Sequence, residues 1–84
     1  MLYVYGWNVC PHCRKAVKFL KEHRIPYEYR EIEEQPAEVV AKVVEVNGGD
    51  DWVVPTLEYN GKWAPGEAFN ERRFTDVLKE LGIL

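Results

Sequence analysis

The tetrapeptide Cys10-Pro11-His12-Cys13 constrains this chain more than any other feature. It holds the only two cysteines, follows a strand-like run at residues 2–5, and leads into a basic amphipathic stretch at residues 14–24. If the motif begins a helix, its spacing places both sulfurs within one turn, close enough for a disulfide. The first sulfur then lies where free backbone N–H groups and the helix dipole stabilise a thiolate. The pattern therefore predicts a redox-active cysteine pair.

Length and composition narrow the class of protein to which the chain can belong. A chain of 84 residues, 46% hydrophobic, suits a single domain over residues 1–84 with one core. The net charge of −3 gives no sign of a nucleic-acid partner. No apolar run approaches the roughly 18 residues of a membrane span, and no signal peptide is evident. We therefore expect a cytoplasmic monomer, in which a cysteine pair is catalytic or metal-binding rather than a structural disulfide.

The charges are unevenly distributed along the chain. Residues 11–24 carry five basic side chains and one acidic one, whereas residues 28–51 carry eight acidic and two basic ones. Such runs are typical of solvated surfaces. The basic helix is also expected to help hold a thiolate at Cys10.

The stretch that follows the motif predicts a helix over residues 11–24. Its apolar positions recur at helical spacing, namely at Cys13, Ala16, Val17 and Leu20. This pattern turns Cys13 inward and leaves Cys10 as the outer sulfur. Trp7, in the loop before the motif, is interpreted either as a core residue or as an exposed platform for a partner.

The middle of the chain predicts a strand and a second helix. Residues 27–32 alternate with period two, as a strand does. Acidic residues and Pro36 then introduce a helix. Its valines favour a strand, but Asn47-Gly48-Gly49 is a good helix stop. We predict the helix, with one face formed by Ala37, Val40, Ala41 and Val44.

The last third predicts a hairpin and a final helix. Residues 53–59 form a strand with Pro55 near its start, Asn60-Gly61 is a two-residue turn, and residues 62–64 are the return strand. Asn70 is the expected N-cap of a helix that Gly82 ends. The inner face of this helix is Phe74, Val77, Leu78 and Leu81.

The predicted element order is therefore β-α-β-α-β-β-α. The opening βαβ unit implies a parallel pair of strands, and the hairpin adds an antiparallel pair. We predict an α/β domain with a four-stranded mixed sheet flanked by three helices.

At this point the sequence resembles the glutaredoxin branch of the thioredoxin superfamily over essentially its whole length. The resemblance rests on the Cys-x-x-Cys motif after the first strand, on Val53-Val54-Pro55, and on Asn60-Gly61 followed by Gly66. Val46-Asn47-Gly48-Gly49 also looks like the mycoredoxins, and the single domain suits these and the NrdH-type redoxins. The resemblance implies a thioredoxin fold and a cis peptide bond before Pro55.

The resemblance also implies a reaction. Cys10 is expected to attack a substrate disulfide and Cys13 to resolve the mixed disulfide, with no bound cofactor. Val53, Val54, Pro55 and Gly66 are expected to contact the substrate, which is a protein disulfide or a small-thiol disulfide. An external reductant, either an NADPH-dependent flavoprotein such as thioredoxin reductase or a low-molecular-weight thiol, restores the dithiol.

The chain departs from the family where glutathione is recognised. Trp7 replaces the usual Lys before the motif, and Asp51-Trp52 replaces a basic or amide residue before the Val-Pro pair. The Gly-Gly-x-x-Asp signature becomes Pro65-Gly66-Glu67-Ala68-Phe69. These changes predict weak binding of an anionic tripeptide. They favour a protein partner, or a thiol without carboxylates, on an apolar rim of Trp7 and Trp52, with Trp63 as a further candidate.

Two alternatives remain open from the sequence. His12, if protonated, would favour the thiolate of Cys10 and so tune the motif together with Pro11; otherwise it is a neutral exposed side chain. The cysteine pair could instead bind a metal or an iron–sulfur cluster. A structural zinc site needs four protein ligands, and no second Cys or His pair occurs at ligand spacing. We therefore expect no metal site.

Overall fold

The computed structural model describes residues 1–84 and contains four strands and three α-helices. In chain order the elements are β1 (Leu2–Gly6), α1 (Pro11–Glu22), β2 (Tyr27–Glu31), the 3-10 turn η1 (Ile32–Glu34), α2 (Ala37–Val46), β3 (Thr56–Tyr59), β4 (Lys62–Ala64) and α3 (Glu71–Leu81). The strand order is β2-β1-β3-β4, with β1 parallel to β2 and antiparallel to β3. The predicted fold class and mixed sheet are confirmed.

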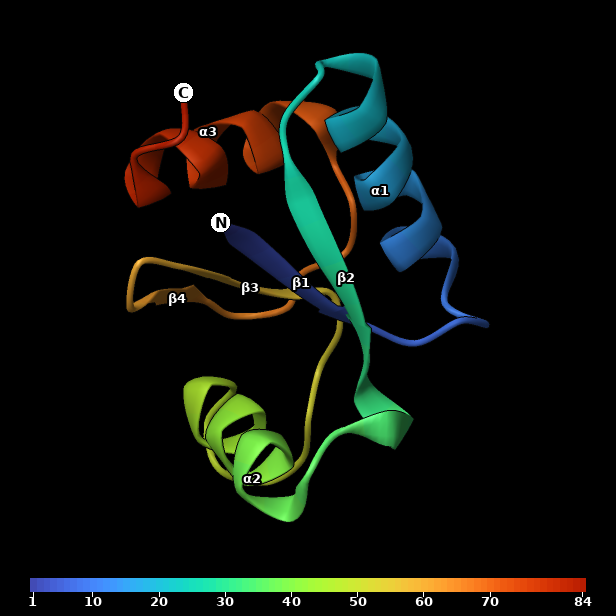
Figure 1. The fold of residues 1–84 in the computed structure, drawn as a ribbon, viewed down its shortest axis with the longest axis vertical. Helices are drawn as coiled ribbons and strands as arrows, with labels where there is room; N and C mark the ends of the chain where they lie inside the picture. The colour runs from blue at the N-terminus through green and yellow to red at the C-terminus, as the bar shows by residue number, and fades with distance from the viewer.

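The sheet lies between two unequal layers (Figure 1), with α1 and α3 over one face and α2 over the other. Successive side chains of β1 point to opposite faces. Leu2 and Val4 enter the larger core with residues of α1 and α3. Tyr5 enters the smaller core with Ile32 and Val43. The alternation along one central strand thus divides the apolar side chains between two cores.

The final helix follows the sequence prediction closely. Asn70 accepts a hydrogen bond from the backbone N–H of Arg73 at 2.9 Å and so caps α3. Gly82 follows the helix with φ of 88°, a left-handed conformation that glycine adopts at little cost. The predicted inner face is buried in full, namely Phe74, Val77, Leu78 and Leu81.

The boundaries of α1 and β2 differ from the predicted ones. Helix α1 ends at Glu22 rather than at residue 24, because Arg24 has φ of 54° and Ile25 N–H bonds back to the Leu20 carbonyl. Ile32 begins η1 instead of ending β2. In α1, Phe19 is buried, whereas the predicted Val17 is only half-buried. The inward stripe is broader than predicted because α1 packs on α3 as well as on the sheet.

The predicted inner face of α2 is only partly correct, because Val40 and Val44 are half-buried but the two alanines are not. Ala37 and Ala41 are exposed, and the one fully buried residue of the helix is Val43. Val39 and Val40 pack beside it against the smaller core. The alanines and valines of α2 together cover more than half of the helix circumference, so periodicity alone does not select a face. The aromatic side chains of the sheet face under α2 make that selection.

Strand β3 begins at Thr56 rather than at residue 53. Pro55 has no N–H to donate to a neighbouring strand. The Val53 carbonyl accepts a hydrogen bond from Thr56 Oγ1 at 2.6 Å rather than from a neighbouring strand. Residues 53–55 therefore form a connection that lies before the strand.

Candidate functional site

The two cysteines lie at the start of α1 with different exposure. Cys10 is the N-cap residue, is half-buried, and donates its backbone N–H to the Trp7 carbonyl at 2.9 Å. Pro11 occupies the first helical position, where a missing N–H costs no hydrogen bond. Cys13 is 2% exposed, and both thiols are free. The predicted arrangement of an outer and an inner sulfur is found.

Burial raises the pKa of the Cys13 thiol to about 12. A backbone hydrogen bond with Trp7 opposes this shift, and the neighbouring Cys10 and Glu31 add to it. Glu31 accepts a hydrogen bond from Tyr29 Oη at 3.0 Å, and its Oε2 is buried without a partner. Cys13 is therefore held as a neutral thiol near neutral pH, behind the more accessible Cys10.

The connection before β3 contains the predicted cis peptide bond between Val54 and Pro55. Pro55 is buried, Val54 is half-buried against the smaller core, and Val53 is 43% exposed. Neither the N–H nor the C=O of Val54 takes part in a backbone hydrogen bond within the chain. This backbone is therefore free to pair with an extended ligand.

Gly66 lies against this connection. Its backbone N–H donates to Asn47 Oδ1 at 2.8 Å. Asn47 Nδ2 donates in turn to the Val43 carbonyl at 2.8 Å and to Thr56 Oγ1 at 2.9 Å. One amide side chain thus joins the end of α2, the start of β3 and residue 66. Sequence reasoning used Asn47 only as part of a helix stop and missed this role.

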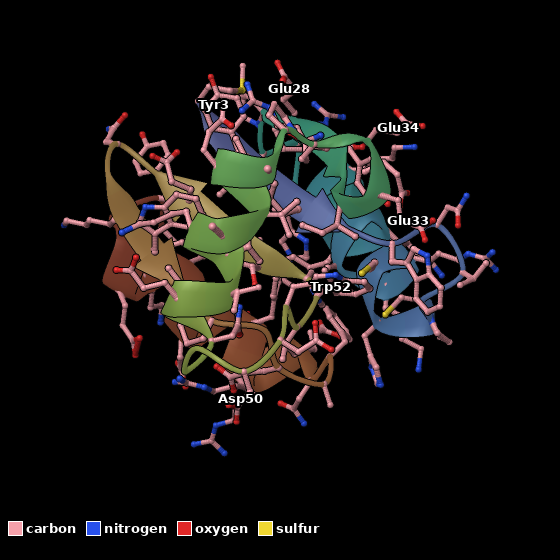
Figure 2. All side chains as sticks on the ribbon, turned by 90° about the horizontal axis from the view of Figure 1, so that it is seen from below. Tyr3, Glu28, Glu33, Glu34, Asp50 and Trp52 are labelled. Atoms are coloured by element: carbon pink, nitrogen blue, oxygen red, sulfur yellow. The ribbon has the colours of Figure 1, made fainter.

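Trp7 and Trp52 meet edge to face, with ring centroids 5.9 Å apart. This contact joins the loop before Cys10 to the connection after α2 (Figure 2, where Trp52 is labelled). Both rings are half-buried against the smaller core, so Trp7 combines the two alternatives of core residue and platform. Trp63 packs against the same smaller core, where it stacks on Tyr5 with ring centroids 5.6 Å apart, but it makes no ring contact with Trp7 or Trp52.

His12 makes a contact that the sequence did not reveal. Its Nδ1 accepts a hydrogen bond from the backbone N–H of Phe69 at 2.9 Å. A nitrogen that accepts this bond carries no proton. In this geometry His12 ties the motif to residues 66–69. This hydrogen bond, the contact of Trp7 with Trp52 and the contact of Gly66 with Val53 bring three segments together in one site. The segments are residues 7–13, 52–55 and 66–69.

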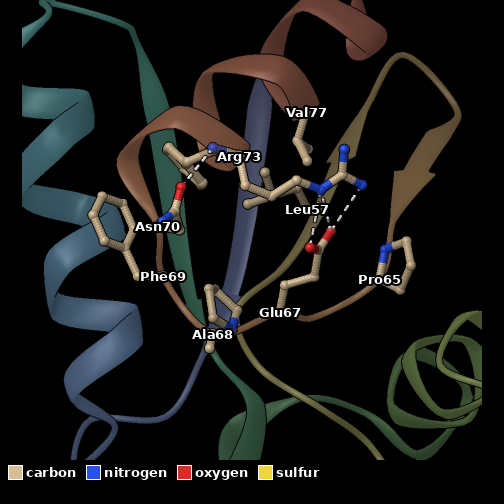
Figure 3. Close-up of a pocket in the computed structure, with 10 residues that line it drawn as sticks. Leu57, Pro65, Glu67, Ala68, Phe69, Asn70, Arg73 and Val77 are labelled. Atoms are coloured by element: carbon tan, nitrogen blue, oxygen red, sulfur yellow. Dashed lines mark hydrogen bonds and ion pairs between the residues drawn. The ribbon is translucent and has the colours of Figure 1, made fainter.

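Beside these segments, a small cavity of about 20 Å³ lies between the loop over residues 65–70 and α3. Glu67 holds Arg73 across it through an ion pair of 3.0 Å (Figure 3). A space of that size admits about one water molecule. The guanidinium is already paired at this position, so it is not a free anchor for a carboxylate.

Other sequence expectations concern metals and membranes. No three His, Cys, Asp or Glu side chains converge into a group able to hold a metal ion. Each of the helices is too short or too polar to cross a bilayer. Nothing in the structure favours the alternative of a metal or cluster module.

A mixed four-stranded sheet with a Cys-x-x-Cys motif at the start of α1 and a cis-proline connection before β3 defines a protein of the thioredoxin fold. The glutaredoxin family model matches residues 2–64, which is most of the chain. The chain therefore belongs to the glutaredoxin family, whose members are thiol–disulfide oxidoreductases.

Curated relatives and solved structures agree with this assignment. The glutaredoxin-like protein NrdH from two strains of Lactococcus lactis is 44% identical over 46 residues. That match covers 55% of this chain and 62% of each relative, which is less than two thirds of their length. The glutaredoxin of Archaeoglobus fulgidus superposes with a TM-score of 0.70 and 27% identity, over 93% of this chain and 85% of that one.

Wheat glutaredoxin superposes equally well, with a TM-score of 0.70 at 20% identity, over 99% of this chain and 76% of that one. At this identity the likeness shows the fold alone. The same fold is thus shared by archaeal and plant members of the family.

Proposed function

We propose that the protein is a dithiol reductase in which Cys10 is the nucleophile and Cys13 the resolving thiol. The observation that carries the proposal is the contrast between a half-buried Cys10 at the start of a helix and a fully buried Cys13 whose pKa is raised. In this proposal the more accessible first sulfur attacks the substrate disulfide, and the buried second sulfur has a role only within the protein.

The reaction proceeds in two exchanges. The Cys10 thiolate attacks one sulfur of the substrate disulfide, forms a mixed disulfide and releases the other sulfur as a thiolate. Cys13 then loses its proton and attacks the Cys10 sulfur, which releases the second substrate thiolate. Two electrons pass to the substrate, and the protein is left with a Cys10–Cys13 disulfide. An external reductant then supplies two electrons and two protons, which reduce this disulfide back to two thiols.

Substrate contacts are proposed for the connection that carries Pro55. The unused N–H and C=O of Val54 support pairing with an extended substrate backbone, like a short added strand. Val53 and Gly66 border this position, and the Trp7–Trp52 pair offers an apolar face. Alanine at both Trp7 and Trp52 should raise KM for a protein disulfide several-fold. Unchanged kinetics would remove the pair from the substrate site.

We further propose that a flavoprotein reductase using NADPH, rather than glutathione, returns electrons to the pair. Asp50 and Asp51 are exposed in the connection between α2 and β3, and their negative charges disfavour an anionic tripeptide. Arg73, which would otherwise be free to bind a carboxylate, is paired with Glu67. Such a system operates in the cytoplasm, where thiols are kept reduced.

A coupled disulfide-reduction assay tests this function. The wild type and Cys13→Ser are compared with a thioredoxin-reductase system in one arm and glutathione with its reductase in the other. The proposal expects turnover with the flavoprotein alone, lost in Cys13→Ser. Turnover with glutathione that survives Cys13→Ser would instead make the protein a monothiol glutaredoxin.

A further inference from the structure

A groove runs along α1 on the side away from α3. It has a volume of about 580 Å³ and lies between α1 and β2. Strand β2 is at the edge of the sheet, so no further strand fills the space beside it (Figure 1). The groove is lined by Trp7, Asn8, Cys13, Arg14, Val17, Lys18, Lys21, Glu22, Tyr27 and Tyr29.

The lining is apolar inside and basic at its helical wall. Tyr27 and Tyr29 are two residues apart on β2 and so share one face of the sheet. Val17 of α1 is half-buried above them. Trp7 and Cys13 close the end next to the motif. A ligand in this groove would therefore cover apolar surface and pass beside Cys13, three residues from Cys10 in the same motif.

The charged side chains that α1 contributes to the groove are almost all basic. Arg14, Lys18 and Lys21 recur at helical spacing along it, and Glu22 is the one acid. Arg14 donates two hydrogen bonds to the Asn8 carbonyl, at 3.2 and 2.9 Å, which fixes its guanidinium near the motif. Lys18 and Lys21 form no ion pair within the chain. The protein as a whole has a charge of −3, so this basic surface is local.

We propose that this groove receives an extended acidic segment of a protein substrate, close to the disulfide that the Cys10–Cys13 pair reduces. The proposal rests on the proposed function and adds the kind of partner to it. The carboxylates of the segment would face the lysines, and its apolar side chains would cover Val17 and the tyrosines. The free edge of β2 offers backbone groups for pairing with an extended chain.

The length of the groove favours a polypeptide over a small thiol. Its lining runs along α1 from Arg14 to Glu22, which at the rise of an α-helix is about 12 Å, and continues past the motif to Trp7. A small disulfide would fill only part of this length. An extended chain covers it with about four residues.

Two synthetic peptides test the proposal. They have equal length and the same internal disulfide, and the flanking residues are glutamate in one and lysine in the other. The readout is the ratio of kcat/KM for the acidic peptide to that for the basic peptide within each protein. The wild type should prefer the acidic peptide by about tenfold, mainly through KM, and this preference should shrink as salt is added.

Charge-reversed variants locate the effect. Lys18→Glu with Lys21→Glu should abolish or invert the preference. Lys62→Glu with Lys79→Glu is the matched control, because it changes the net charge equally at exposed lysines outside the groove. A wild type without preference, or equal losses in the two double variants, would overturn the proposal. If the wild type fails to reduce even hydroxyethyl disulfide, the proposed function itself fails.

Discussion

Gly66 lies so close to Val53 that no side chain fits between them. A Cβ placed on Gly66 would be 2.7 Å from the carbonyl carbon, the carbonyl oxygen and Cγ1 of Val53. Two of these atoms are backbone, which cannot move aside as a flexible side chain can. The loop after β4 thereby sets the position of the connection that carries Pro55.

Replacing Gly66 with alanine should therefore displace residues 53–55. We expect a loss of about 1–3 kcal/mol in the free energy of unfolding, as for overpacked sites, together with a several-fold rise in KM. Gly61→Ala is the matched control: its φ of 86° costs stability, but no atom lies within 4 Å of the new Cβ. Denaturant titration and steady-state kinetics measure both effects. A KM that rises equally in the two variants would argue against this contact.

Asn47 should couple energetically to Thr56. Asn47→Ala leaves the Gly66 N–H without its partner and removes the bond to Thr56 Oγ1, so we expect a loss of about 1–3 kcal/mol. Thr56→Val keeps the side-chain shape but removes the hydroxyl. A double-mutant cycle between the two should give a coupling of about 0.5–3 kcal/mol. Additive losses would show that the two side chains act independently.

The Cys13 thiol should make the reduced protein sensitive to alkali. Its pKa is about 12 in the folded protein, against an ordinary value of 9.0. The folded state then binds this proton more tightly than the unfolded chain, so stability declines as the pH rises from about 9.0 to about 12. Unfolding measured under reducing conditions should show a smaller decline in Cys13→Ala. Identical pH profiles for the two proteins would contradict the raised pKa.

The sequence predicted the parts of the fold that local patterns determine. The motif at the start of a helix, the Asn60-Gly61 turn and the cap at Asn70 each depend on a few neighbouring residues, and all are present. The face of α2 was predicted only in part, because its alanines and valines together cover more than half of the helix circumference. There, contacts with Tyr5 and Ile32 from distant parts of the chain decide the packing.

The difference between local patterns and contacts from distant parts of the chain also applies to the site. The cysteines and Pro55 were identified from short motifs. Asn47 reaches Gly66 across 19 positions of the chain, and His12 reaches Phe69 across 57 positions. No local spacing encodes such contacts. The polar residues that hold the site together therefore emerge only once the chain is folded.

The most direct test of the central claim is to trap the mixed disulfide. Cys13→Ser and Cys10→Ser are each mixed with a peptide disulfide, and the products are mapped by mass spectrometry. If Cys10 is the nucleophile and Cys13 resolves, Cys13→Ser should accumulate the peptide on Cys10, and Cys10→Ser should remain largely unmodified. Rapid and preferential attachment to Cys13 would contradict the account.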